Sequence, residues 1–321
     1  MKTGLVCITT FFVIVSLFVI SKYSSEHTST KAHRLSVSFR TYKHLKPSVH
    51  YKDSIPPLHI EHLTMIGTEG IYGVDGIKGK LLRSLRFQNI TDAVEWRYNL
   101  PRHTILAMVM EESSGIEDLP NALGDGGFGL CHMQPPVAQE FGLVVYQNCT
   151  AMICNGKHPR SCKDERDRLC NHASDLKKIV AQYKTDRRVL IRYDERLNRL
   201  LNLDAVGRML ASHMDGPAYG ANGPFHTAIL RYAGTHNYKA YWRDVRRNMK
   251  ALVNKKLLAT LEQEFNALNP NLTINGEPAD FDRYIALSQE QNYNYGLAQY
   301  MALPLYLPRN SDTVLATLGK F

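Results

Sequence analysis

The segment Leu100–Leu143 constrains the fold of this chain more than any other part of its sequence. Within it, Ile105–Met110 is an unbroken apolar run. A helix that is apolar on every side must be buried. The run ends abruptly at Glu111 and Glu112, and a segment rich in glycine follows. The sequence therefore predicts a buried helix that delivers a carboxylate to a glycine-rich turn.

Apolar residues recur with helical spacing through most of the chain, whereas alternating strand patterns are scarce. The chain is therefore expected to be mostly α-helical. Besides the opening helix, the spacing predicts helices over residues 91–98, 204–214, 226–232, 238–252, 257–268 and 280–301.

The amino-terminal residues predict export from the cell. Residues 1–20 are mostly apolar and fit a signal anchor or a signal peptide. An uncleaved anchor is favoured because Lys22 and Tyr23 interrupt the small residues that a cleavage site needs. Residues 21–57 are polar and basic and are interpreted as a tether with little structure. We expect the chain to lie in the cell envelope or periplasm, with its amino-terminal segment anchored in the inner membrane.

The rest of the chain is predicted to be one domain, residues 58–260, with an insert at 145–190. Residues 261–321 are expected to form a C-terminal helical extension of unknown role. The insert contains four cysteines with the spacing C-x4-C-x7-C-x7-C, namely Cys149, Cys154, Cys162 and Cys170. In an oxidising compartment this spacing predicts two disulfides of undetermined pairing. A zinc site is the less favoured alternative, because C-x2-C pairs are missing. Cys131 is left over and is expected to be a buried free thiol.

The chain carries a formal net charge of +9, which favours an anionic partner. No RNP-like motif and no paired Cys/His finger spacing accompanies this charge, so nucleic acid is not an expected partner. No cofactor and no metal site is expected from the sequence. The helix at 238–252 has a basic face, formed by Lys239, Arg243, Arg246, Arg247 and Lys250, which is interpreted as a solvated surface.

Three motifs, in this order along the chain, resemble the soluble-lytic-transglycosylase-like domain of the lysozyme superfamily. The first is Glu112-Ser113 at the end of the apolar helix. The second is Gly129–Ala138, which aligns without gaps to the family pattern G-L-M-Q-x-M-P-x-T-A and agrees with it at its glycine, leucine, proline and alanine. The third is Tyr232–Gly234, which looks like Y-N-A-G with the asparagine missing. The resemblance covers residues 90–250 and is interrupted by the cysteine-bearing insert.

The resemblance implies a lysozyme-like fold and cleavage of peptidoglycan strands at the β-1,4 bond between MurNAc and GlcNAc. It assigns Glu112, rather than Glu111, as the single acid and base. The sugar's own C6 hydroxyl then attacks and leaves a 1,6-anhydro end. Glu112 follows a fully apolar helix, so partial desolvation is expected to favour its protonated form. Peptidoglycan glycan strands are the implied partner.

The resemblance also implies substrate contacts from Ser113, Gly129, His132, Gln134 and Tyr232. Cys131 and His132 stand where the family has Met and Gln. Either His132 or Gln134 is expected to take over the polar contact of that Gln, and the sequence does not choose between them. Tyr232 is expected to orient Glu112 or the sugar. In the helix at 238–252, Tyr238, Tyr241 and Trp242 are interpreted as core rather than as a platform for sugars.

Two alternatives stay open. In the first, a hydrolase of the same fold uses a second carboxylate to position water, as glycosidases with paired carboxylates do. Asp125 in the glycine-rich turn is the main candidate, with Glu117 and Asp118 nearby in the sequence. In the second, the altered motifs mark a catalytically silent wall-binding or scaffold protein.

Overall fold

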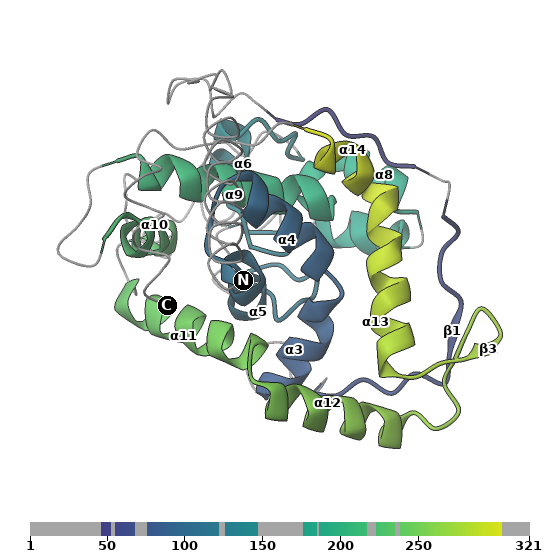
Figure 1. Ribbon diagram of the computed structural model, residues 1–321. Helices are drawn as coiled ribbons and strands as arrows, with labels where there is room; N and C mark the ends of the chain where they lie inside the picture. The colour runs from purple at the N-terminus through teal and green to yellow at the C-terminus, as the bar shows by residue number, and fades with distance from the viewer. Residues whose placement is uncertain are drawn as a thin grey trace, which may run out of the picture. The chain divides into compact units, whose positions relative to one another are not determined.

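The computed structural model describes residues 46–52, 55–67, 76–121, 126–146, 176–184, 186–216, 223–234 and 238–303 (Figure 1). The contacts divide the chain into two units, Met1–Val37 and Ser38–Phe321, and every described residue belongs to the second unit. In these described ranges no helix has the length and apolar character needed to cross a membrane. The predicted amino-terminal membrane segment lies outside them.

The described part of the chain is mostly helical, which confirms the prediction of a mostly α-helical chain. Its α-helices are α3 (Ile77–Leu85), α4 (Gln88–Arg97), α5 (Thr104–Glu112), α6 (Pro135–Glu140), α8 (Arg187–Tyr193), α9 (Arg199–Met214), α10 (Gly223–Ala233), α11 (Tyr238–Leu252), α12 (Lys255–Leu268), α13 (Phe281–Glu290) and α14 (Leu297–Met301). Two 3₁₀ helices, η2 (Glu195–Leu197) and η4 (Gln291–Tyr295), join them. The strands are short: β1 (Ile60–Glu61), β2 (Thr273–Ile274) and β3 (Glu277–Pro278).

Helix α5 lies at the centre of the core, as its apolar sequence predicts. Every residue from Thr104 to Met110 is buried. The helix packs against α11, α3 and α4, and a second group forms where α9 packs against α10 and α4. Gly207 of α9 permits close contact with α4, because a Cβ atom at this position would come within 2.5 Å of Val94 and 2.6 Å of Tyr98. The packing therefore fixes the direction in which α5 presents its last residues.

Several predicted helix boundaries were wrong. Helix α9 begins at Arg199 rather than at residue 204, and α10 begins at Gly223 rather than at residue 226. Helix α4 begins at Gln88 rather than Thr91, because the Thr91 hydroxyl bonds the Gln88 carbonyl one turn earlier instead of capping the helix. The predicted helix over 280–301 is broken. Helix α13 ends at Glu290, and Gly296 adopts φ +89° before α14 begins. A left-handed residue cannot continue a right-handed helix, and glycine adopts that conformation at little cost.

The end of the predicted tether is ordered against the domain, contrary to the expectation of little structure. Lys46 pairs with Glu195 at 2.8 Å, and the ring of Tyr51 meets the ring of Tyr295 edge-on at 5.3 Å between centroids. The Lys52 amide also donates to the Asn294 carbonyl. Aromatic burial and backbone pairing compensate for the polar composition of this segment.

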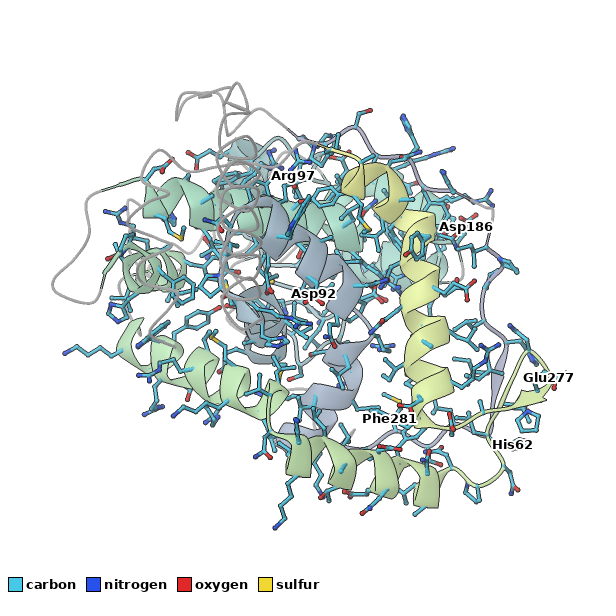
Figure 2. The ribbon with its side chains drawn as sticks, viewed as in Figure 1. His62, Asp92, Arg97, Asp186, Glu277 and Phe281 are labelled. Carbon is cyan, nitrogen blue, oxygen red and sulfur yellow. The ribbon has the colours of Figure 1, made fainter. Side chains whose placement is uncertain are left out.

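The described part of the predicted C-terminal extension shares the main hydrophobic core. Side chains from α12, α13 and α14 belong to it, including Leu261, Phe265, Tyr284 and Tyr300. A hairpin of β2 and β3 turns through Asn275 and Gly276, both with positive φ, and β1 adds to it in antiparallel register. Figure 2 shows His62 and Glu277 near this small sheet and Phe281 at the start of α13.

Candidate functional site

Both ends of α5 are held by neighbouring elements. At its amino end, the Glu95 carboxylate of α4 accepts the backbone N–H groups of His103 and Ile105, each at 2.7 Å. Glu95 is 2% exposed. Burial raises its pKa from 4.5 to about 8, although the amides of Ile105 and His103 act in the opposite direction. This carboxylate thus caps the helix whose far end carries Glu112.

The turn after α5 is fixed by two arginines. The Arg83 Nε group donates to the Ser114 carbonyl at 2.8 Å, and an Arg86 guanidinium nitrogen donates to the Gly115 carbonyl at 3.0 Å. Gly115 has φ +76°, and a Cβ atom there would lie 2.7 Å from the backbone of Arg83. Only glycine fits this close approach. The exit of the chain from α5, and with it the position of Glu112, is therefore tightly defined.

The two adjacent glutamates at the end of α5 have different surroundings. Glu111 accepts a hydrogen bond from the Asn248 amide at 3.2 Å and has two cations nearby, Lys80 at 3.7 Å and Arg247 at 3.8 Å. Glu112 instead faces the glycine-rich segment, where its Oε2 lies 3.7 Å from Nδ1 of His132. Its side chain is 17% exposed. Periodicity cannot separate these two residues, but their environments do.

The glycine-rich segment 126–134 folds back on itself beside α5. Phe128 and Met133 form an isolated antiparallel bridge, and the His132 amide donates to the Gly129 carbonyl. Gly129 has φ +82°, and a Cβ atom there would lie 2.3 Å from the Arg196 carbonyl oxygen and 2.6 Å from the Asn202 side chain. Gly129 is therefore required both for its backbone conformation and for close packing.

Two buried polar side chains hold this segment from the other side. One terminal nitrogen of Arg196 donates to the carbonyls of Gly126 at 2.7 Å and Met133 at 2.9 Å. Arg196 is in turn paired with the buried carboxylate of Asp194 at 2.7 Å. The Asn202 side-chain oxygen accepts the Cys131 amide at 3.1 Å. The carbonyls of Gly126 and Met133 and the amide of Cys131 are thus bonded by side chains from α9 and the 3₁₀ helix before it.

His132 lies between two parts of the site. Its side chain is 5% exposed and its φ is +42°. Nε2 lies 3.0 Å from the Leu119 carbonyl oxygen, in the chain that leaves α5, while Nδ1 faces Glu112. The ring therefore joins the carboxylate to the turn that follows it.

Tyrosines from two helices complete the cluster. The Tyr232 hydroxyl of α10 donates to the Cys131 carbonyl, and the Tyr232 ring stacks on Tyr241 of α11 with centroids 5.9 Å apart. The Tyr241 hydroxyl is buried and makes no hydrogen bond of standard length and angle with a described residue. Burial, followed by the charge of Glu112, raises the pKa of Tyr241 well above 10.0. Tyr241 thus lies beside Glu112 and against Tyr232, whose own contact with Glu112 or the sugar stays a prediction.

The other predicted contacts occupy defined positions. Ser113 is fully buried, and its hydroxyl donates to the Val109 carbonyl at 3.3 Å. Gln134 is half-buried and precedes Pro135 at the start of α6. The Ser113 hydroxyl therefore has a structural role, because it bonds a carbonyl of the last turn of α5. Its contact with a sugar, like that of Gln134, stays a prediction.

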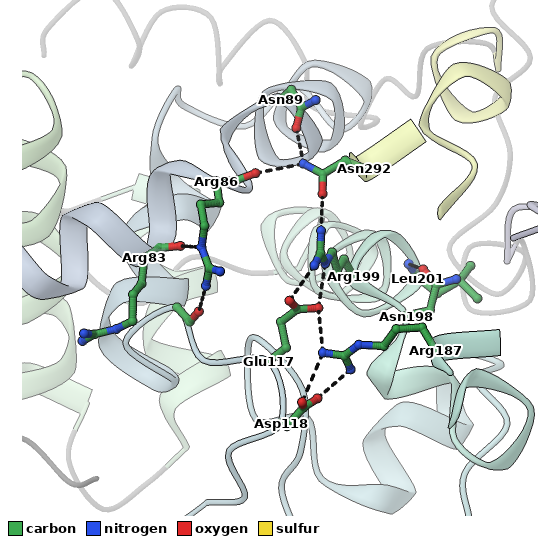
Figure 3. Close-up of polar contacts among 11 residues, drawn as sticks. Arg83, Arg86, Asn89, Glu117, Asp118, Arg187, Asn198, Arg199, Leu201 and Asn292 are labelled. Carbon is green, nitrogen blue, oxygen red and sulfur yellow. Dashed lines mark hydrogen bonds and ion pairs between the residues drawn. The ribbon is translucent and has the colours of Figure 1, made fainter. Parts of the chain in front are cut away.

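Glu117 and Asp118 belong to a separate ion-pair network (Figure 3). Arg199 donates to both oxygens of Glu117, at 2.6 and 2.8 Å, and Arg187 donates to both oxygens of Asp118, at 2.6 and 3.1 Å. Burial alone would raise the pKa of Glu117, but Arg199 and Arg187 lower it to about 2. Asn292 of η4 accepts a further bond from Arg199 at 2.8 Å. The network ties the turn after α5 to the C-terminal part of the domain.

Several predicted residues lie outside the described part of the chain, namely Asp125, Cys149, Cys154, Cys162 and Cys170. Cys131 is a buried free thiol, as expected. Burial, with a further contribution from Glu112, raises its pKa well above 9.0. In the ranges that the structure describes, no three His, Cys, Asp or Glu side chains are grouped so that they could hold a metal ion.

Sequence reasoning missed three residues of this site: Arg196, Asn202 and Tyr241. Asn202 had a visible signal, because it is a polar residue between Leu201 and Leu203 in α9. Arg196 and Tyr241 had none, because an arginine in a charged stretch and a tyrosine on an apolar stripe have ordinary structural explanations.

Comparisons with protein-family models, curated proteins and solved structures find no match to this chain.

Proposed function

We propose that this chain is a peptidoglycan lytic transglycosylase that cleaves the β-1,4 bond between MurNAc and GlcNAc, with Glu112 as its single acid and base. The observation that carries the proposal is the position of Glu112. This glutamate is the last residue of a buried apolar helix and faces a glycine-rich turn. The side chains of Arg196 and Asn202 form hydrogen bonds with the backbone of that turn. The motif order described above connects this arrangement to the family.

The local electrostatics suit an acid catalyst. Glu112 is the last residue of α5, where the aligned peptide dipoles place partial negative charge. Its side chain is also largely withdrawn from water. Both features oppose ionisation of the Glu112 carboxyl group, which suits this group to act as a proton donor. A glycosidic oxygen needs such a proton donor as its bond to carbon breaks.

In the proposed reaction, the O–H bond of Glu112 breaks and its proton passes to the leaving glycosidic oxygen. The C6 hydroxyl of the same MurNAc ring attacks C1 and forms the 1,6-anhydro bond. The carboxylate of Glu112 then accepts the proton of that hydroxyl, which restores the acid. Water is not consumed, and protons balance over the cycle. Tyr241, beside Glu112, is suited to stabilise the intervening carboxylate by donating its hydroxyl hydrogen.

The ion pairs of the nearby carboxylates, Glu117 and Asp118, support a reaction that uses a single carboxyl group. Glu117 and Asp118 are bound by arginines, and Glu117 with a pKa of about 2 is a fixed anion at neutral pH. Both are thereby committed to structure rather than to positioning water. Asp125 is the remaining candidate for the hydrolytic alternative.

We further propose that the protein acts in the cell envelope, after export and with residues 1–20 as its inner-membrane anchor. The cysteines of the insert would then form disulfides in the oxidising periplasm. The basic face of α11 supports an anionic partner, because Arg243, Arg246 and Lys250 are exposed along it. Glycan strands with acidic peptide stems have the complementary charge.

Mass spectrometry of purified sacculi after digestion with the full-length protein tests this function. The proposal predicts muropeptides that end in 1,6-anhydro-MurNAc. Reducing MurNAc ends would instead indicate a hydrolase, and an Asp125→Asn variant would then lose activity. If the sacculi yield no soluble product but retain the protein on pelleting, the chain is a wall-binding protein.

A further inference from the structure

The side chains of Glu112 and His132 are in close contact in the candidate site. Glu112 Oε2 and His132 Nδ1 are 3.7 Å apart, and both side chains are largely shielded from water. This separation is slightly longer than a hydrogen bond. Contacts between catalytic groups are often long without substrate and shorten when the complex forms.

The other ring nitrogen of His132 fixes its tautomer. Nε2 lies 3.0 Å from the carbonyl oxygen of Leu119. A carbonyl oxygen accepts hydrogen bonds and cannot donate them, so Nε2 must carry hydrogen in both the neutral and the charged ring. In the neutral ring, Nδ1 therefore holds a lone pair directed at Glu112. Any hydrogen bond between the two groups then requires one proton, which belongs either to the carboxyl group or to Nδ1.

Titratable groups from neighbouring elements lie around this pair. Tyr241 of α11 and Cys131 of the glycine-rich segment lie near Glu112, and Tyr232 of α10 contacts both of them. Burial and the charge of Glu112 raise the pKa values of Tyr241 and Cys131, so both stay neutral near pH 7. The cations Lys80 and Arg247 lie on the side of Glu111. Among these neighbours, the proton balance near neutral pH thus belongs to Glu112 and His132.

We propose that Glu112 and His132 share one proton and titrate as a coupled pair, with His132 as the residue that keeps the acid loaded. This inference rests on the proposed function for its catalytic meaning. His132 is a positioning residue, since it acts on substrate only through Glu112. At low pH the pair holds two protons, over a broad middle range one, and at high pH none. The one-proton state is the active acid, and it can deliver its proton to a leaving oxygen through Oε of Glu112.

The pair widens the pH range in which the acid is loaded. A lone glutamic acid with an ordinary pKa loses its proton well below neutral pH. In the pair, the negative charge of Glu112 stabilises the imidazolium, so the last proton leaves only above the ordinary range of histidine. The basic limb of the pH–rate profile should therefore follow the departure of this shared proton.

Nitrogen-15 NMR of the histidine rings tests the pair without any substrate. The chain has 13 histidines, so the His132 signal is identified by its loss in His132→Gln. We expect the Nε2–H tautomer in the neutral ring, and a titration midpoint that falls by about one pH unit or more in Glu112→Gln. Glu111→Gln is the matched control and should leave the midpoint unchanged, because Glu111 contacts Lys80, Arg247 and Asn248 instead.

The pH profile of sacculus digestion is the second measurement. His132→Gln should move the basic limb of kcat/KM down by about one pH unit, in addition to any loss of rate that is equal at every pH. A merely structural role would lower the rate equally at every pH. His132→Asn gives a second test if His132→Gln does not fold, because asparagine tolerates the positive φ at this position.

The outcomes separate the two proposals. A His132 midpoint that ignores Glu112→Gln, or an Nδ1–H tautomer, overturns the pair even when the protein digests sacculi. A coupled midpoint without any digestion supports the pair and overturns the proposed function. Coupling together with a shifted basic limb supports both.

Discussion

Two buried glutamates, one before α5 and one after it, differ sharply in protonation. Glu95 caps the start of the helix through backbone amides, and burial raises its pKa to about 8. For Glu117, beyond the other end, burial acts in the same direction, but Arg199 and Arg187 reverse the shift and lower the pKa to about 2. Burial alone therefore does not decide whether a carboxyl group holds its proton. For Glu117 the charge of two arginines outweighs burial, whereas for Asp118 burial and the charge of Glu117 outweigh Arg187 and raise the pKa.

Glu112 lies in sequence between these two and combines features of both sites. Like Glu95, it is held beside apolar core residues of α5. Unlike Glu117, it faces an imidazole and a phenol, whose charge state depends on pH rather than being fixed. We interpret this intermediate environment as the reason why the proton-transfer role falls to Glu112.

Replacing Arg199 with methionine should have the largest effect on stability. The substitution leaves Glu117 buried with half of its neutralising charge removed. Breaking a buried ion pair costs about 3–5 kcal/mol of unfolding free energy, because an uncompensated charge stays behind. Chemical denaturation of Arg199→Met measures the loss. The double variant Glu117→Gln/Arg199→Met should be destabilised by less than the single Arg199→Met change, and equal losses would contradict an ion-pair role.

The pH dependence of stability tests Glu95. Its pKa is raised from 4.5 to about 8 in the folded state, so between these values the folded protein holds a proton that the unfolded chain has released. The contribution of Glu95 is therefore fully present below pH 4.5 and is lost as pH rises toward 8. A pKa raised from 4.5 to about 8 corresponds to a loss of about 5 kcal/mol.

Denaturation of wild-type protein and Glu95→Gln at several pH values measures this contribution. The glutamine oxygen still accepts one of the two amide donors, so the variant should fold. It should lose the fall in stability between pH 5 and 8. An equal fall in both proteins would show that Glu95 is ionised in the native state throughout this range.

Part of this architecture was predictable from sequence. The apolar run of α5 and the amphipathic spacing of α11 predict two helices, and both form. That these two helices pack against each other was not predicted. The break at Gly296 was missed, because a single glycine in a helical pattern is usually tolerated. The start of α4 was missed because Phe87 precedes it, and phenylalanine is not a typical capping residue.

The candidate site was predictable only where it follows the chain locally. The glutamate at the helix end and the glycine turn are neighbours in sequence. The polar groups that hold them come from far away and are ordinary residues in their own segments. Arg196 reaches the carbonyls of Gly126 and Met133 from beyond the cysteine-bearing insert. No local sequence pattern predicts this contact, since it depends on how α9 and the residues before it pack against the turn.

Replacing Gly129 with alanine should destabilise the turn by about 1–3 kcal/mol and reduce activity, because the new Cβ atom meets the Arg196 backbone and φ is strained. Gly234→Ala is the matched control. Gly234 has φ +71° with open space around its Cβ position, so it reports the backbone strain without the clash. Thermal unfolding and digestion rates of both variants separate the effect of the steric clash from the effect of the backbone strain. Equal losses would argue against close packing at Gly129.

Replacing Tyr232 with phenylalanine should have the smallest effect. The change removes one hydrogen bond to the Cys131 carbonyl, worth about 0.5–1.5 kcal/mol of unfolding free energy. The stacking on Tyr241 is kept, because the ring is unchanged. Chemical denaturation checks the value. A complete loss of digestion with intact stability would instead give the Tyr232 hydroxyl a direct role in the reaction.

The rate of sacculus digestion by Glu112→Gln, compared with Glu111→Gln, tests the central claim most directly. The two variants make the same chemical change at adjacent positions of α5. We predict that Glu112→Gln loses activity on the order of 10²–10⁴-fold, as expected for removal of a general acid. Glu111→Gln should stay within a few-fold of wild type. Full activity in Glu112→Gln would contradict the assignment of Glu112 as the catalytic acid.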